Sequence, residues 1–202
     1  MECVRPFVAP VTLAGRQVTL EPLRTGHGDE LRAAVADGAL SQLWVTGVPA
    51  PDGVDAWIAA ALAMREREGA LPFAVRERAG GTVVGSTRYF RVDAGNRRLE
   101  IGHTWYAPRV QRTGVNTECK LLLLTHAFEV LDCIAVEFRT HFFNFASRAA
   151  IARLGAKQDG ILRQHQIQPD GTLRDTVVFS IIAPEWPVVK RHLRFELERP
   201  RN

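Results

Sequence analysis

The segment 111–117, Gln-Arg-Thr-Gly-Val-Asn-Thr, has the residue types of an anion-binding turn. It lies between an expected strand and an expected helix, so the free N–H groups and the positive dipole end of the helix point at one place. Gly114 is small, and Arg112 adds a fixed positive charge. Short side-chain donors come from Thr113, Asn116 and Thr117. We therefore expect a phosphate at this turn, although ordinary strand-to-helix connections use the same residue types.

Other motifs with recognisable chemistry are missing from the sequence. It contains neither G-x-x-x-x-G-K-[ST] nor G-x-G-x-x-G, so the P-loop and dinucleotide interpretations lack their signatures. The cysteines Cys3, Cys119 and Cys133 are odd in number and have no C-x-x-C spacing. We therefore expect buried or idle thiols, no disulfide framework and no metal site.

Composition sets the class of protein. The 202 residues are 46% hydrophobic and 24% charged, which is typical of a globular chain, and we expect one domain over 1–202. The formal charge of +4 comes from arginines spread along the chain, a pattern that does not favour nucleic acid as a partner. No apolar run approaches a membrane span and no signal peptide opens the chain. A cytoplasmic protein without membrane contact is expected.

The hydrophobic patterning predicts the elements that position the turn. Three consecutive strands form an antiparallel meander, and helices and strands alternate after it, which predicts a mixed α/β sheet with helices on its faces. Asp52 is expected to cap the second helix. Strands are expected at 16–23, 71–78, 82–92, 97–107, 133–142, 160–168 and 173–182. Helices are expected at 27–38, 51–69, 114–131 and 144–155, with an amphipathic tail helix from 188.

The order of these motifs resembles a known family. The pattern Gln-x-x-Gly-x-Asn at 111–116 opens a helix after a meander, and a strand and the segment NFASRAAIARLGA follow. This resembles the GNAT superfamily of acetyl-coenzyme A-dependent N-acetyltransferases, most of all its RimJ/RimL-type branch, and the resemblance covers 15–190. It implies a GNAT-like fold and acetyl-CoA as co-substrate.

The resemblance implies roles for the turn and for the strand before it. The turn holds the coenzyme pyrophosphate through Gln111, Arg112, Thr113, Gly114, Val115 and Asn116, with Thr117 beside them. Asn116 departs from the family, which has Gly or Ala there, and we expect its side chain to donate an extra hydrogen bond. The strand 97–107 is expected to diverge from 133–142 and leave room for pantetheine. Backbone donors for the thioester carbonyl are expected from Thr104, Trp105 and Tyr106.

Acetyl transfer needs a base for the amine, and two candidates lie on the strand 97–107. Glu100 is the first, because it lies near the expected thioester and matches the glutamate of the family's E-I-G pattern. The alternative is a structural carboxylate paired with Arg97 or Arg98. His103 is the second candidate. Strict alternation places it on the face opposite Glu100, and a β-bulge would change that.

The acid and the acceptor site are less well defined. Many relatives use a tyrosine on the helix after the fifth strand; here Ser147 replaces it as the expected donor to the thiolate. Asn144 is expected beside pantetheine, and it is also an ordinary N-cap. For Trp44 and Trp57 we expect a role in core packing, and the alternative is that they line an amine pocket.

The predicted function is transfer of an acetyl group from acetyl-CoA to a primary amine, either a protein N-terminus or a small molecule. The resemblance is compatible with a homodimer. The alternative is a CoA-binding sensor or interaction protein that has lost catalysis.

Overall fold

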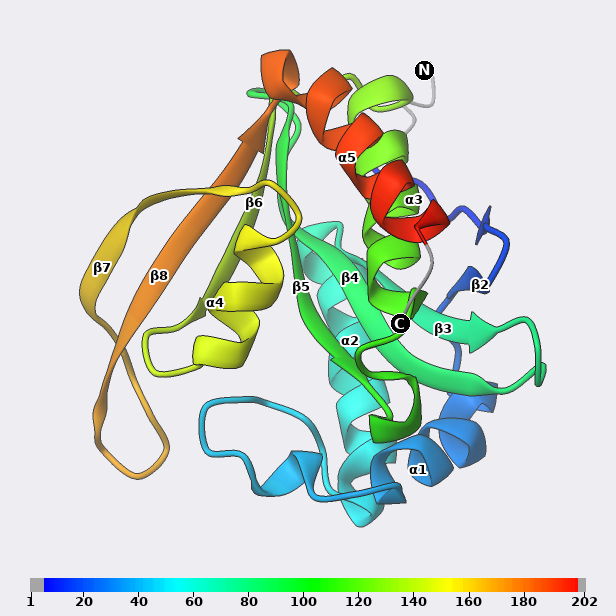
Figure 1. Ribbon diagram of the computed structural model, residues 1–202. Coiled ribbons are helices and arrows are strands. Elements are labelled where there is room, and N and C mark those ends of the chain that lie inside the picture. Colours follow the sequence, from blue (N-terminus) through cyan, green and yellow to red (C-terminus); the bar gives the residue numbers. More distant parts are fainter. Residues whose placement is uncertain (1–5, 200–202) are drawn as a thin grey trace, which may run out of the picture.

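Eight strands form one mixed sheet in the computed structural model of the protein, which describes residues 6–199 (Figure 1). Their spatial order is β1-β2-β3-β4-β5-β6-β8-β7, and within the described residues β5 and β6 are the parallel pair. The strands are β1 (Leu13–Ala14), β2 (Val18–Pro22), β3 (Leu71–Glu77), β4 (Val83–Asp93), β5 (Arg98–Tyr106), β6 (Ala135–His141), β7 (Lys157–Ile167) and β8 (Leu173–Ile182). The expected meander is β3-β4-β5.

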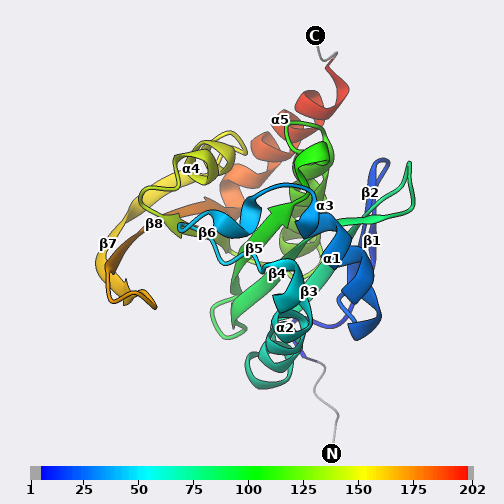
Figure 2. The ribbon, with the colours of Figure 1, turned by 90° about the horizontal axis from the view of Figure 1, so that it is seen from below.

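Helices cover both faces of this sheet (Figures 1 and 2). They are α1 (Gly28–Ala36), α2 (Val54–Glu68), α3 (Val115–Glu129), α4 (Phe145–Ala152) and α5 (Trp186–Glu198). Alternation along β4 shows the two sides. The Tyr89 hydroxyl donates to the Leu123 carbonyl of α3, whereas the next side chain back, Arg88, lies over Trp57 of α2. We call these the α3 face and the α2 face. None of the described helices is long and apolar enough to cross a membrane.

The helix α2 begins differently from the sequence expectation. Its buried residues Val54, Ile58 and Ala61 have the predicted helical spacing, and Gly69 ends it with a left-handed φ of 65°. Asp52 is not its cap, so that expectation is wrong. A 3-10 turn over Pro51–Gly53 precedes the helix and moves the N-cap position to Gly53, which has no side chain to accept a bond.

The strands β5 and β6 pair only at their first residues. Their register joins Arg98 to Ala135, Leu99 to Val136 and Glu100 to Glu137, and no further pair is present between them in the described chain. β6 pairs along its whole length with β8 instead. The second half of β5 therefore has a hydrogen-bonding edge that no strand covers, as the GNAT resemblance implies.

Candidate active site

The start of α3 lies directly beside this uncovered edge. Gly114 occupies its N-cap position and has no side chain to accept from the first N–H groups of the helix. Arg112 has a left-handed φ of 61°, which turns the chain from β5 into α3. The Thr113 hydroxyl donates to the Val110 carbonyl at 2.6 Å and accepts from the Val115 N–H at 3.3 Å. The turn therefore offers chiefly backbone donors.

Several predicted ligands in the turn already hold the fold together. The Gln111 amide donates to the Tyr106 carbonyl at 2.9 Å and ties the turn to the end of β5. The buried Thr117 hydroxyl accepts from Arg153, just after α4, at 3.2 Å. That bond places the C-terminal end of α4 next to the start of α3. The side chains of Arg112, which is exposed, and Asn116, which is half-buried, remain the best placed to reach a ligand.

The hairpin β1–β2 braces the other side of the turn. The Glu118 carboxylate accepts three backbone N–H groups, from Arg16 at 2.9 Å, Gln17 at 2.6 Å and Val18 at 2.8 Å. The Gln17 amide in turn covers Gly114: a Cβ at that position would lie 2.4 Å from it. A side chain at position 114 would therefore have to displace the Gln17 amide.

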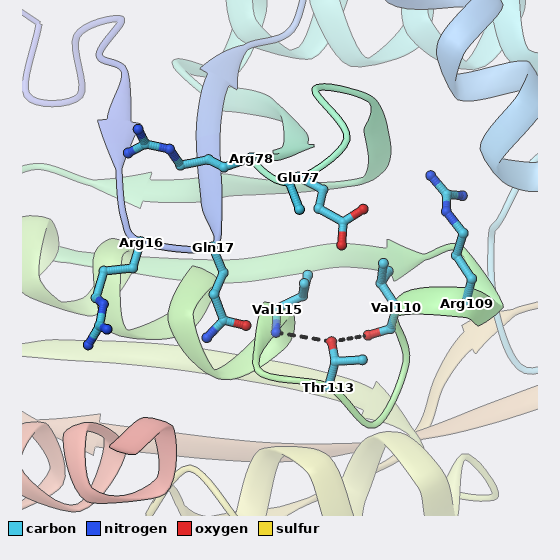
Figure 3. A pocket seen from close by; sticks show the side chains of 9 residues that line it. Arg16, Gln17, Glu77, Arg78, Arg109, Val110, Thr113 and Val115 are labelled. Carbon is cyan, nitrogen blue, oxygen red and sulfur yellow. Dashed lines mark hydrogen bonds between the residues drawn. The ribbon is translucent and has the colours of Figure 1, made fainter. Parts of the chain in front are cut away.

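A pocket of about 430 Å³ adjoins this brace (Figure 3). Thr113 and Val115 line it from the turn, and three arginines make it basic: Arg16, Arg78 and Arg109. Arg78 donates to the Gly15 carbonyl and Arg109 to the Thr82 hydroxyl, so both also hold neighbouring loops. The pocket adds positive charge on the side of the turn away from α4.

The backbone of β5 presents its donors to the gap beside β6. Ala107 donates its N–H to Val84 of β4 at 2.8 Å. N–H directions alternate along a strand, so those of Tyr106 and Thr104 point away from β4, toward β6. The N–H of Trp105 points toward β4 by the same rule. Of the three predicted donors, geometry therefore favours Thr104 and Tyr106.

A β-bulge interrupts β5 at His103. Ser86 pairs with Trp105 while Arg88 pairs with Gly102, so Thr87 alone faces two residues, and His103 has a φ of 49°. The His103 ring contacts the Phe90 ring, with centroids 4.8 Å apart. Phe90 is also the partner of Glu100 across the pair β4–β5.

His103 and Glu100 therefore lie on the same face, the α2 face. The expectation of opposite faces from strict alternation is wrong, because the bulge places Gly102 and His103 on one side.

Glu100 is a buried carboxylate without a close partner for one oxygen. Its Oε2 lies 3.5 Å from the Nε of Arg91 and 3.5 Å from that of Arg139, and it makes no hydrogen bond. Burial raises the pKa of Glu100 to about 7, although both arginines act to lower it. The expected alternative pairing is wrong: Arg97 pairs with Asp132, and Arg98 with Glu137. Arg97 lies just before β5 and Arg98 is its first residue, so both find partners near the start of the strand.

His103 has the opposite electrostatics. Solvent reaches its side chain, yet enough protein atoms surround the ring that burial lowers its pKa to about 4, and Arg88 and Arg91 add to this effect. The imidazole is thus neutral at physiological pH and a weak base. Because a general base works best with a pKa near the working pH, Glu100 fits the role better than His103.

Sequence reasoning missed a buried lysine behind the bulge. Lys120 of α3 donates to the hydroxyls of Thr104 at 2.8 Å and Thr87 at 3.3 Å, and it is 4% exposed. Burial lowers its pKa to about 8. The sequence does carry a signal for this buried lysine, because it stands within the apolar run of α3. Its ammonium group lies behind the strand that carries the Thr104 N–H.

The start of α4 follows the predicted capping pattern. The Asn144 side chain accepts from the Ser147 N–H at 3.0 Å, so the N-cap interpretation is confirmed. Ser147 is half-buried. The helix has no tyrosine, and the two tyrosines of the chain, Tyr89 and Tyr106, are buried on the α3 face.

The two tryptophans have different environments. Trp57 packs edge-on against Trp105, with centroids 6.0 Å apart. Trp44 is 65% exposed and stacks edge-on against His141, at the end of β6, with centroids 4.8 Å apart. Core packing is therefore wrong for Trp44, which belongs to the surface of the α2 face. Among residues 6–199 no group of His, Cys, Asp and Glu side chains could hold a metal ion.

The site thus combines a divergent β5–β6 pair, an uncapped α3 and a buried carboxylate on a bulged strand. The chain belongs to the GNAT acetyltransferase family: residues 17–157 match the acetyltransferase (GNAT) domain. The family, the fold and the class of enzyme expected from the sequence are confirmed.

Individual relatives agree with this assignment. A GCN5-related N-acetyltransferase from Brucella melitensis is 33% identical, with a TM-score of 0.84 over 96% of this chain and 88% of that one. The Bacillus subtilis protein named "Putative ribosomal N-acetyltransferase YdaF" is 31% identical over 106 residues, which are 52% of this chain and 57% of YdaF. RimJ of Mycobacterium smegmatis, solved in complex with CoA-disulfide, shares the fold at 23% identity, with a TM-score of 0.75 over 93% of this chain and 95% of that one.

Proposed function

We propose that residues 1–202 act as one N-acetyltransferase domain that moves an acetyl group from acetyl-CoA to a primary amine by direct attack in a ternary complex. The amine belongs to a protein N-terminus or to a small molecule. The observation that carries the proposal is Glu100, a buried carboxylate with a raised pKa beside the uncovered edge of β5. The name of YdaF, a ribosomal N-acetyltransferase, supports a protein acceptor by analogy.

The residues present fit the coenzyme. Backbone N–H groups of 112–116, with Arg112 and Asn116, would hold the pyrophosphate, because the helix start is uncapped and basic. The uncovered edge of β5 would hold the pantetheine arm, with Asn144 beside it. When bound, acetyl-CoA supplies the activated thioester. The RimJ structure, which was solved with CoA-disulfide, supports this choice of coenzyme by analogy.

Each catalytic requirement has a residue in this arrangement. Glu100 takes the proton of the amine, because its pKa of about 7 keeps much of it ionised at neutral pH. The N–H groups of Thr104 and Tyr106 stabilise the oxyanion, with the Lys120 charge behind them. The Ser147 hydroxyl donates to the departing thiolate. His103 is the second candidate for the base.

One observation favours a catalytically weak CoA-binding protein as the alternative. The helix α4 has no tyrosine, and both tyrosines of the chain are buried on the α3 face. A dedicated acid would then be limited to Ser147.

Calorimetric titration with acetyl-CoA, in buffer free of phosphate and sulfate, tests the coenzyme site. Micromolar binding supports it, and a folded protein that does not bind would contradict it. Release of the CoA thiol on addition of amines then separates the two candidate functions. Binding without thiol release from any amine would favour the sensor.

A further inference from the structure

Arginines from three strands converge around Glu100 on the α2 face. Arg91 is on β4, Arg139 on β6 and Arg174 on β8. Arg91 and Arg139 each approach the Glu100 carboxylate at 3.5 Å, too far for a strong hydrogen bond. Arg174 lies near enough to act on the pKa of Glu100, and its Nε is buried without a hydrogen-bond partner.

The positive charge here exceeds what the nearby carboxylates balance. Glu137 bonds Arg98 at 2.6 Å and Arg139 at 2.9 Å, so it is already shared by two arginines. Glu100 is then the remaining carboxylate for Arg91 and Arg174, and its raised pKa of about 7 leaves it partly neutral. Four guanidinium groups thus face two carboxylates. A buried donor without a partner costs free energy unless a ligand satisfies it.

The neighbouring histidines add donors and acceptors rather than charge. His103, His141 and His165 all have pKa values lowered first by burial, with Arg174 contributing at each ring. His165 lies 3.0 Å from the Thr176 hydroxyl, which brings β7 to the same face. Thr176 also pairs with His141 across β6–β8, and Arg174 lies two positions before Thr176, so strand alternation puts the Arg174 side chain on the same face.

We propose that Arg91, Arg139 and Arg174 bind an anionic group of the acceptor, a carboxylate or a phosphate, and so direct its amine to Glu100. The guanidinium fork suits both anions, since it can donate two parallel hydrogen bonds. The inference rests on the proposed acetyl transfer and names its substrate class: small primary amines that carry a negative charge. A strongly basic peptide segment would meet repulsion at the same place.

Matched acceptors test the proposal directly. Glycylglycine is compared with glycylglycinamide, and phosphoethanolamine with ethanolamine, so each pair differs only in the anion. We expect kcat/KM to be at least about 10-fold higher for the charged member of one pair, since one charge-assisted hydrogen bond is enough for a preference of that size. The pair that responds tells a carboxylate site from a phosphate site. Equal kcat/KM in both pairs would overturn the inference.

Variants of Arg174 locate the effect. Arg174→Gln should raise KM about 10-fold for the preferred anionic acceptor, with little change for its neutral partner or for acetyl-CoA affinity. Arg174→Lys should restore part of the loss. Arg163→Gln is the matched control, because Arg163 pairs with Asp175 on the same hairpin, is 78% exposed and changes the net charge equally. A KM unchanged by Arg174→Gln would overturn the inference.

The test stays informative if acetyl transfer fails. Titration of the acetyl-CoA-saturated protein with the same four amines measures acceptor binding without turnover. Tighter binding of an anionic amine in the wild type, lost in Arg174→Gln, would support the anion site even with no thiol release. Thiol release with equal preference for all four amines would sink the anion site and leave the proposed function standing.

Discussion

The two sides of β5 are prepared for binding in opposite ways. On the proposed coenzyme side several side chains are already bonded within the protein, as with Gln111 to Tyr106 and Asn144 to Ser147, and most of the groups offered to a ligand are backbone N–H. On the acceptor side the unused groups belong to side chains, namely Glu100 Oε2 and Arg174 Nε. A backbone site suits a ligand common to a whole family, whereas a side-chain site can change with every substitution.

The largest expected effect tests Glu100, on the acceptor side of β5. Glu100→Gln should lower kcat by about 10²–10⁴-fold if the carboxylate is the base. In the wild type kcat/KM should rise with pH through about 7, because burial raises the pKa of Glu100 to that value and the base acts when deprotonated. The variant should lose this rise. Glu137→Gln is the matched control: it should keep the rise but move it to lower pH, because the Glu137 charge helps to raise the pKa of Glu100. An unchanged profile in Glu100→Gln would remove Glu100 as the base.

The buried charge of Lys120 should change how the free energy of unfolding depends on pH. Burial lowers the pKa of Lys120 from 10.5 to about 8, so its charged form costs about 3 kcal/mol below pH 8. This cost disappears between about pH 8 and 10.5, where the unfolded chain binds more protons. The unfolding free energy of the wild type should therefore rise with pH relative to that of Lys120→Met.

Denaturant titrations of both proteins at pH 7.5 and 10 measure this difference, following the standard linear extrapolation. The buried Cys133, whose pKa burial also raises, is present in both proteins, so its contribution cancels in the difference. A constant difference between the two proteins would show that Lys120 has an ordinary pKa.

A smaller effect tests the turn at Gly114, on the proposed coenzyme side of β5. Gly114→Leu should weaken acetyl-CoA binding by about 10–100-fold, because a side chain there meets Gln17 and displaces the turn from its phosphate-binding geometry. Calorimetry measures the affinity. In the double variant with Gln17→Ala the packing clash is relieved; recovery of affinity would mean that Gly114 serves only packing and not the approach of phosphate.

The smallest effect separates two roles of one residue. Asn144→Ala should cost about 1 kcal/mol of stability, the usual loss of an N-cap. Asn144→Asp keeps the acceptor for the Ser147 N–H and removes only the side-chain donor, so stability should stay unchanged. If Asn144 also contacts pantetheine, Asn144→Asp should still weaken coenzyme binding. Normal affinity in both variants would limit Asn144 to capping.

The sequence was a better guide to the secondary structure around the turn 111–116 than to the surroundings of Glu100. Most helices and strands follow local patterns, so their positions could be predicted, although the start of α2 could not. The bulge at His103 could not, because strict alternation carries no sign of one extra residue. The arginines around Glu100 come from β4, β6 and β8, and their meeting depends on β8 lying between β6 and β7. That order is a property of the folded chain.

The brace between Glu118 and the hairpin β1–β2 also sets when the site can form. Its three hydrogen bonds join residues about 100 positions apart, such as Val18 and Glu118. During synthesis at about 5–20 residues per second, the hairpin must wait roughly 5–20 s for its partner. The turn proposed to bind the coenzyme is thus ordered late, after most of the meander has left the ribosome.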